Sequence, residues 1–246
     1  TLSEQEHIAV VEKTVEFAAG RIPVIAGCGS NSAAHAIAVS RRFAQPGVVA
    51  GLSVTPYYNK PTQEGLYRHY CAIAEASGLP QILYNVPGRT CCDLKPETVA
   101  RLAKVPGIIG LKEATGDLSR TPLLRELCGP DFALYSGDDA SGCDFMLQGG
   151  DGVISVTTNI AAPQMADMCR AALAGDAGQA HDINNRLMPL HQTLFCEPSP
   201  IPVKWACARL GLMATATLRL PLTDLTPEGE QAMARALTTA ELMASV

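Results

Sequence analysis

The sequence predicts an α/β fold built on a parallel sheet. Six short apolar runs recur along roughly the first two-thirds of the chain, and each is too short for a buried helix but fits a strand that is apolar on both faces. Stretches with helical periodicity separate these runs, whose ends lie 18 to 30 residues apart. A β–α repeat of this size builds a parallel sheet. The six runs are 22–26, 48–54, 81–84, 108–111, 132–135 and 152–154.

A helix is expected between the second and third runs. Leu66, Tyr70 and Ile73 fall on one face of it, so this face can pack against the sheet. Gly78 is placed to end the helix, because glycine readily adopts the left-handed conformation found at helix C-termini. Pro96 suits the first turn of the next helix, where its missing N–H costs nothing.

Two closures of the sheet compete. An open doubly wound sheet usually carries a glycine-rich phosphate turn, but Ser32 stands where the turn that starts at Gly27 needs its third glycine. A closed (β/α)₈ barrel needs eight strands, two more than the six runs. We expect the two further units to precede the sequence given, because its last third is helical in character.

The last third of the chain predicts a separate helical domain. Thr226 and Pro227 suit the cap and the first turn of its last helix, and the proline-rich stretch 197–202 is a rigid joint within it. We therefore expect a barrel domain over residues 1–160 and a C-terminal helical domain over residues 161–246. The expected helices are about 163–175, 177–196, 199–210 and 227–243.

Composition excludes several classes of protein. The chain has 246 residues, of which 47% are apolar and 17% charged, with a net charge of −5, so a globular fold is expected and a nucleic-acid partner is not. No apolar run approaches the roughly 18 residues that a membrane span needs, and the polar, acidic start is unlike a signal peptide. The nine cysteines are odd in number and lack metal-site spacing, which favours a reduced cytoplasmic protein without a metal.

Lys112 and Tyr84 are the first candidates for chemistry. Each stands at the C-terminal end of a predicted strand, and the two are 28 residues apart, one repeat unit, so they should lie at similar heights on neighbouring strands. A lysine amine forms a Schiff base once it is deprotonated, and a nearby phenol can pass protons. The alternative is a lysine that extends into solvent and a tyrosine that packs in the core.

Three strand-end loops carry further candidates. Arg89 follows Tyr84 in the same loop, and its planar guanidinium suits a carboxylate, although an isolated arginine can equally be a surface residue. Tyr57 and Tyr58 are adjacent in another loop, where packing or an interface would also explain them. The stretch 136–139, Ser-Gly-Asp-Asp, could be a helix cap only. No G-x-S-x-G elbow supports a serine hydrolase.

At these positions the chain closely resembles the dihydrodipicolinate synthase family of pyruvate-dependent class I aldolases. The matching segments extend over nearly the whole chain. They are TPYYNKP at 55–61, YNVPGRT at 84–90, GLKEATG at 110–116, SGDD at 136–139 and EPSPIPVK at 197–204. The resemblance implies a (β/α)₈ barrel with a C-terminal helical domain, assembled as a homotetramer and needing no cofactor.

The resemblance also implies a reaction and the residues that carry it. Lys112 would form an imine with pyruvate, and the resulting enamine would attack L-aspartate 4-semialdehyde to give 4-hydroxy-tetrahydrodipicolinate on the diaminopimelate route to lysine. Tyr84 would shuttle protons, and Tyr58 would join this relay across a subunit interface. Arg89 would hold the carboxylate of the semialdehyde, and the backbones of Gly137 and Ile154 would line the pyruvate pocket.

A lysine feedback site is a further implication. His7, Asn31 and Tyr57 match positions that bind lysine in inhibited members of the family. Glu4 stands where those members often have histidine, and His35 where they have glutamate, so inhibition by lysine is not expected.

The sequence departs from the family at its start. The family's Gly-Thr-Thr-Gly-Glu motif and its first two strands have no counterpart here, which agrees with the deficit of two strands. Two rival functions stay open at this point. One is a sister lyase that acts on N-acetylneuraminate or a 2-keto-3-deoxy sugar acid, against which Arg89 argues. The other is a non-catalytic binder with the same fold.

Overall fold

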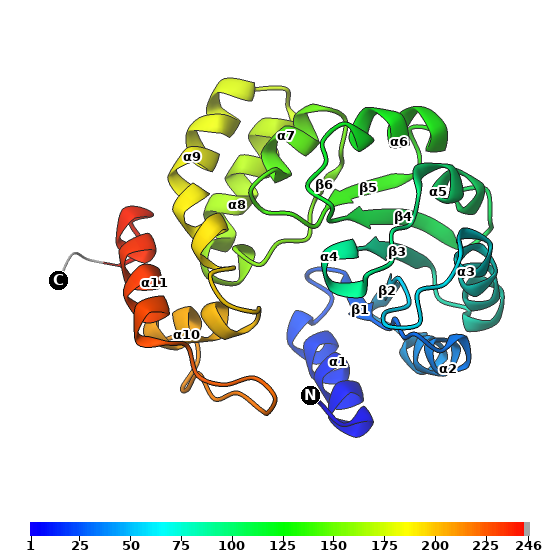
Figure 1. Ribbon diagram of the computed structural model, residues 1–246, viewed down its shortest axis with the longest axis horizontal. Helices are drawn as coiled ribbons and strands as arrows, with labels where there is room; N and C mark the ends of the chain where they lie inside the picture. Colours follow the sequence, from blue (N-terminus) through cyan, green and yellow to red (C-terminus); the bar gives the residue numbers. More distant parts are fainter. Residues whose placement is uncertain (244–246) are drawn as a thin grey trace. The chain divides into compact units, whose positions relative to one another are not determined.

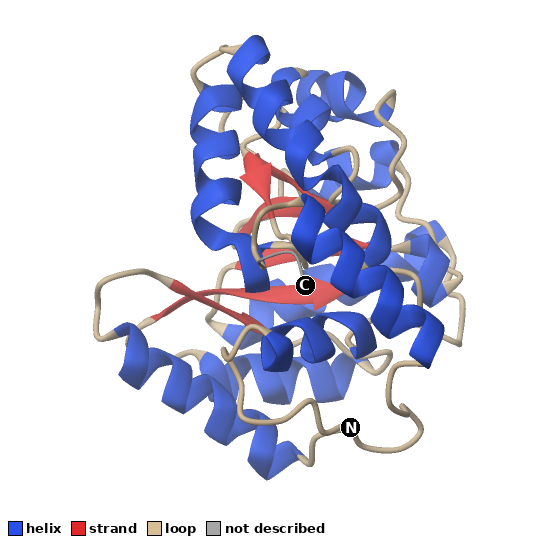
Figure 2. Ribbon diagram, turned by 90° about the vertical axis from the view of Figure 1, so that its left-hand side faces the viewer, coloured by secondary structure: helices blue, strands red, loops and turns tan. Residues whose placement is uncertain are grey.

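The structure, a computed structural model, describes residues 1–243 and consists of two compact units. One unit is Leu2–Gly137, and the other is Asp138–Val246 together with Thr1. All six predicted apolar runs form strands, and the order of the strands in the sheet is their order in the chain. The strands, red in Figure 2, are flanked by helices. The prediction of an α/β fold with a parallel sheet is therefore confirmed.

The first unit alternates strands and helices. Each of the strands β1 to β4 pairs in parallel with the next one. Helices α2, α3, α5 and α6 follow one another around one side of these strands (Figure 1). The elements are α1 (Glu4–Ala18), β1 (Val24–Gly27), α2 (Ala33–Phe43), β2 (Val48–Val54), α3 (Gln63–Ser77), β3 (Gln81–Asn85), α4 (Pro87–Thr90), α5 (Pro96–Leu102), β4 (Ile108–Glu113), α6 (Arg120–Cys128) and β5 (Ala133–Ser136).

Local signals in the sequence set the ends of these helices. Gly78 is the left-handed C-cap of α3, and Pro96 is the first residue of α5, both as predicted. Thr62 caps the other end of α3, where its side chain accepts a hydrogen bond from the Gly65 N–H. Leu66, Tyr70 and Ile73 are the fully buried face of this helix.

The glycine turn after β1 is explained by packing. A Cβ at Gly29 would lie 2.4 Å from the backbone nitrogen of Val54, closer than any real side chain approaches. The turn therefore needs glycine where it passes the end of β2.

The second unit is mostly helical. Its elements are α7 (Gly142–Leu147), β6 (Gly152–Val153), α8 (Thr158–Leu173), α9 (Ala177–Thr193), α10 (Ile201–Arg209) and α11 (Pro227–Thr239). Helix α8 starts before the predicted residue 163 because two helical stretches join across a kink at Ala161, and Pro163 lies at the start of the second stretch. Thr226 caps α11 through a hydrogen bond from the Gly229 N–H, as predicted. Residues 244–246 of the predicted domain lie outside the described residues.

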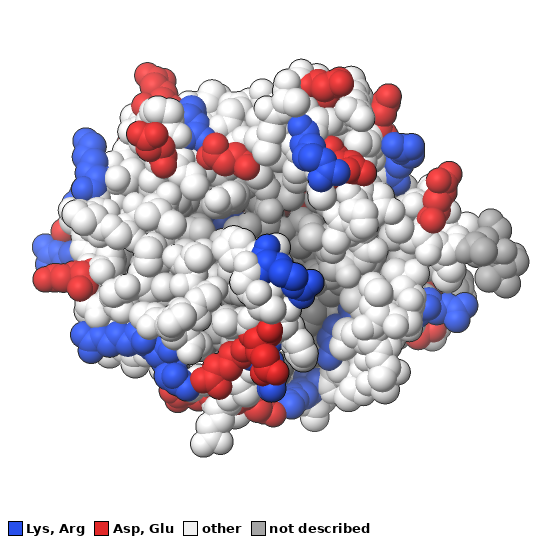
Figure 3. All heavy atoms as spheres, turned by 180° about the vertical axis from the view of Figure 1, so that it is seen from behind, with Lys and Arg blue, Asp and Glu red and all other residues white. Residues whose placement is uncertain are grey.

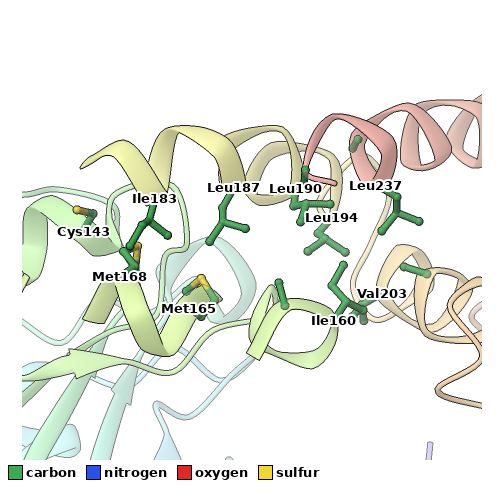
Figure 4. Close-up of a cluster of buried hydrophobic side chains, with 14 of the residues drawn as sticks. Cys143, Ile160, Met165, Met168, Ile183, Leu187, Leu190, Leu194, Val203 and Leu237 are labelled. Carbon is green, nitrogen blue, oxygen red and sulfur yellow. The ribbon is translucent and has the colours of Figure 1, made fainter. Parts of the chain in front are cut away.

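One apolar core holds these helices together. Met165, Met168, Leu187, Leu190 and Leu237 are buried in it and come from α8, α9 and α11 (Figure 4). Side chains from α10 complete the cluster. The two units divide after Gly137, whereas the sequence places its domain boundary at residue 160. The closure into an eight-stranded barrel, the missing strands and that boundary stay predictions.

The surface carries both signs of charge. Lysine and arginine side chains are interleaved with acidic ones on the face shown in Figure 3. All nine cysteines are free thiols. Within residues 1–243, no helix is both long and apolar enough to cross a membrane.

Candidate active site

Lys112 and Tyr84 lie side by side on neighbouring strands. They are register partners of β4 and β3, and the Lys112 Nζ is 4.3 Å from the centroid of the Tyr84 ring. Both side chains are half-buried. A cation at this distance is attracted by the face of the ring, which holds the amine in place. The one-repeat spacing of the two residues thus corresponds to direct contact.

Tyr84 keeps its proton at neutral pH. Burial raises the pKa of the phenol above its ordinary value, and the nearby positive charge of Arg89 opposes this effect only in part. Arg89 is exposed on the short helix α4, which begins two residues after β3 ends. A protonated phenol can donate a proton to a reacting oxygen, and an exposed arginine can receive a carboxylate from solvent.

Gly137 brings the backbone against the lysine. It follows β5 directly, and its N–H donates a 2.7 Å hydrogen bond to the Glu113 carbonyl. A Cβ at Gly137 would lie 2.6 Å from Cε of Lys112. The stem of Lys112 therefore lies against the backbone of residue 137, while its amine lies over the Tyr84 ring.

A buried polar network lies behind this pair. Side chains alternate along a strand, so Glu113 points to the opposite face of β4 from Lys112. Glu113 accepts hydrogen bonds from the Asn85 side chain at 3.2 and 3.3 Å and from the Thr115 N–H at 2.9 Å. Arg120 lies 3.3 Å from the same carboxylate. Burial raises the pKa of Glu113, and the Arg120 charge opposes the rise.

Sequence reasoning did not single out this network. A usable signal was present, because Asn85 and Glu113 are 28 residues apart, the same spacing as Tyr84 and Lys112. Both residues are polar, and each directly follows a candidate side chain at the end of a predicted buried strand. This pattern could have identified them.

The tyrosine loop after β2 is tied to the turn after β1. The Asn31 side chain donates to the Tyr57 carbonyl at 3.3 Å, and the Asn59 side chain donates to the Asn31 carbonyl at 3.0 Å. Tyr58 has a left-handed backbone with φ of 73° and is 89% exposed. The structure thus brings Asn31 and Tyr57 together. His7 lies on α1, where its ring packs edge-on against Phe43 with 5.0 Å between the centroids.

The remaining candidates belong to the second unit. Ile154 follows β6 directly and is half-buried. The two aspartates of the SGDD stretch have separate tasks, since Asp138 accepts from the Ser141 N–H and hydroxyl, while Asp139 accepts from the backbone N–H groups of Val156 and Thr157. The two aspartates thus accept from backbone N–H groups just ahead of α7 and α8, although the N-cap residues of these helices are Ser141 and Thr157. Across residues 1–243, no group of three His, Cys, Asp or Glu side chains could hold a metal ion.

Comparison with known proteins gives consistent matches over nearly the whole chain. Residues 1–240 match the model of the dihydrodipicolinate synthetase family. A 4-hydroxy-tetrahydrodipicolinate synthase of Psychromonas ingrahamii is 60% identical over 243 residues, which are 99% of this chain and 83% of that protein.

Solved structures agree with these matches. The structure of a chloride-inhibited dihydrodipicolinate synthase from Acinetobacter baumannii, in complex with pyruvate, has a TM-score of 0.96 at 50% identity and covers 99% of this chain and 83% of its own. A dihydrodipicolinate synthase from Cyanidioschyzon merolae with lysine bound has a TM-score of 0.94 at 40% identity, again over 99% of this chain and 83% of its own.

Proposed function

This chain belongs to the dihydrodipicolinate synthetase family, and we propose that it uses Lys112 to condense pyruvate with L-aspartate 4-semialdehyde. The product is 4-hydroxy-tetrahydrodipicolinate, in the diaminopimelate route of lysine biosynthesis, and the enzyme is a lyase. The single observation that carries the assignment of residues is the contact of the Lys112 amine with the Tyr84 ring, 4.3 Å from its centroid.

The reaction proceeds through a covalent intermediate. Lys112 first gives up its proton, because only the neutral amine can attack the keto carbon of pyruvate. Water then leaves as the imine forms. Loss of a methyl proton gives an enamine, whose carbon attacks the aldehyde of the second substrate. Cyclisation then releases the product and frees Lys112. Tyr84 is placed to pass protons in these steps, because its phenol is protonated and its ring lies against the amine.

The second substrate and the subunit partner involve exposed residues. Arg89 binds the carboxylate of the semialdehyde from its exposed place on α4. Tyr58 completes the proton relay in a neighbouring subunit, and its 89% exposure leaves the side chain accessible to such a partner. We propose a homotetramer as the assembly that supplies this partner. Gly137 and Ile154 line the pyruvate pocket through their backbones.

Regulation and compartment complete the proposal. His7, Asn31 and Tyr57 are the residues of a lysine site in this family, and the Asn31 side chain bonds to the Tyr57 carbonyl. Glu4 and His35 are both exposed. Inhibited members often have histidine at the position of Glu4 and glutamate at the position of His35, so we expect little inhibition by lysine. The nine free thiols favour the reducing cytoplasm.

Replacement of Arg89 tests the choice of substrate. In Arg89→Ala, KM for the semialdehyde should rise far more than KM for pyruvate, since only the first substrate uses the guanidinium. Arg68→Ala is a matched control, because Arg68 is an exposed arginine of the same unit that pairs with Glu64. Steady-state kinetics with each substrate varied in turn give the two values. Equal effects on both KM values, or cleavage of N-acetylneuraminate or a 2-keto-3-deoxy sugar acid by the wild type, would favour a sister lyase instead.

A further inference from the structure

We propose that four polar residues, the buried Asn85 and Glu113 and the half-buried Asp93 and Arg120, position Lys112 and Tyr84 for the reaction. We call these four the Glu113 network. The inference rests on the proposed function, because it assigns a task to residues that touch neither substrate. They act through the two strands that carry the reacting side chains.

The first step is the register of β3 and β4. Tyr84 pairs with Lys112, and the next pair along the two strands is Asn85 with Glu113. Side chains alternate between the faces of a strand, so one pair faces the reaction and the other faces away from it. A slip of one residue would turn every side chain of the strand to the wrong face. A bond between Asn85 and Glu113 therefore also fixes the direction of Tyr84 and Lys112.

The second step is that both the amide nitrogen and the amide oxygen of the Asn85 side chain have hydrogen-bond partners. Its Nδ2 donates to Oδ1 of Asp93 at 2.9 Å and to both oxygens of Glu113, and its Oδ1 accepts from the Leu94 N–H at 2.9 Å. The side chain is completely buried. An amide is the one uncharged group that can donate between two carboxylates while it accepts from a backbone N–H.

The third step is the clamp from α6. The guanidinium of Arg120 donates to Oδ1 of Asp93 at 2.9 Å and to the Leu94 carbonyl at 2.7 Å, and it lies 3.3 Å from Glu113. The side chain of Arg120 is 12% exposed and that of Glu113 is 3% exposed. Arg120 is the first residue of α6, so it fastens that helix directly to Glu113 at the end of β4. Its link to β3 is indirect, because the loop residues Asp93 and Leu94 that it contacts are the ones that bond to Asn85.

The fourth step is that a gain in stability alone would not explain such a network. Apolar residues of similar volume often replace buried ion pairs without loss of stability, because taking charges out of water costs about as much as the pairing returns. Hydrogen bonds are directional, so they fix the orientation of the residues that they join more strictly than apolar packing does. The place of the network, directly behind Lys112 and Tyr84, makes this geometry useful for the reaction.

Three variants test the inference in the full chain. Asn85→Asp keeps the shape of the side chain but turns the donor into an acceptor between two carboxylates. Arg120→Lys keeps the charge and loses the planar fork, whereas Arg120→Met loses both. Glu64→Gln is the control, an exposed carboxylate of the same unit that pairs with Arg68 and Arg101. For each protein we would measure kcat, KM for pyruvate, the rate at which borohydride traps pyruvate on Lys112, and the folded fraction by circular dichroism.

A positioning role predicts a split between kcat and KM. In Asn85→Asp, kcat and the trapping rate per folded molecule should fall by about 100-fold, the effect of a misplacement of about 1 Å, while KM for pyruvate stays within about twofold. Arg120→Lys should recover part of the rate that Arg120→Met loses, and Glu64→Gln should match the wild type. If Asn85→Asp does not fold, the comparison of the two Arg120 variants decides.

Two results would overturn the inference. One is a rate per folded molecule that equals the wild type in Asn85→Asp and in both Arg120 variants. The other is a loss of activity that follows the folded fraction alone, with no recovery in Arg120→Lys. Failure of the proposed function is a different outcome, because the wild type itself would then not be trapped by pyruvate and borohydride.

Discussion

Gly137→Ala should disable the amine of Lys112 while it leaves the fold intact. The new methyl group would lie 2.6 Å from Cε and 3.1 Å from Cγ of Lys112, and 2.7 Å from Cβ of Ala114. Carbon atoms pack at about 3.5 to 4.0 Å. The lysine stem or the backbone must therefore move by about 1 Å. The lysine stem can rotate away, but the Cβ of Ala114 moves only together with its backbone.

The magnitude follows from that displacement. Added atoms in a packed site cost about 1 to 3 kcal/mol, and the contact with the rigid Cβ of Ala114 places this variant near the upper end. Gly137 does not have a left-handed backbone, so alanine adds no backbone strain. A misplacement of about 1 Å at a reacting group costs about 100-fold in rate. We therefore expect kcat to fall by about 100-fold, with a loss of stability of about 2 to 3 kcal/mol.

The assay compares this variant with a harmless alanine substitution. Gly178→Ala introduces a Cβ whose nearest neighbour is Asp176 Oδ1 at an ordinary 3.7 Å, and it lies in the first turn of α9. We would measure kcat, the rate of borohydride trapping with pyruvate, and urea unfolding for both variants. Gly178→Ala should retain wild-type rates. A Gly137→Ala protein with wild-type kcat and trapping rate would refute the packing argument.

Two further predictions concern stability. Burial lowers the pKa of His69 to about 4 in the folded chain, against about 6.5 when unfolded, so the unfolded chain binds the proton first as the pH falls. About 3 kcal/mol of the stability present above pH 6.5 should therefore be lost between pH 6.5 and 4. Urea unfolding at pH 7.5 and at pH 5 should show a smaller loss in His69→Gln than in the wild type. Equal losses in the two proteins would contradict this. Leu187→Ala should lower the free energy of unfolding by about 2 to 5 kcal/mol, because Leu187 is buried in the core of α8, α9 and α11. A loss below about 1 kcal/mol in the same unfolding assay would mean that this core is loosely packed.

Much of the fold was predictable because its signals are local. Apolar runs of strand length recur with the period of a β–α repeat, and Gly78 and Pro96 mark helix ends by their own backbone geometry. The kink at Ala161 was not predicted, since it depends on how two helical stretches join ahead of Pro163. The division after Gly137 also depends on contacts between residues far apart in the chain.

The candidate site was also predictable only in part. The contact of Lys112 with Tyr84 follows from their equal place in successive repeats, which a sequence displays directly. The Glu113 network could not be recognised as a unit, because Asp93 and Arg120 come from loop and helix positions that only the folded chain brings to Asn85. Gly137 carried no sign of why it must be glycine, since the reason is the stem of Lys112 from another strand.

The most direct test of the account is to find where pyruvate binds covalently. The full chain is incubated with pyruvate and sodium borohydride, digested, and mapped by mass spectrometry, with Lys112→Arg as the matched variant that keeps the charge. The account predicts one reduced pyruvyl adduct, on Lys112, and none in the variant. An adduct on another lysine, or an unmodified Lys112 in a folded protein, would contradict it.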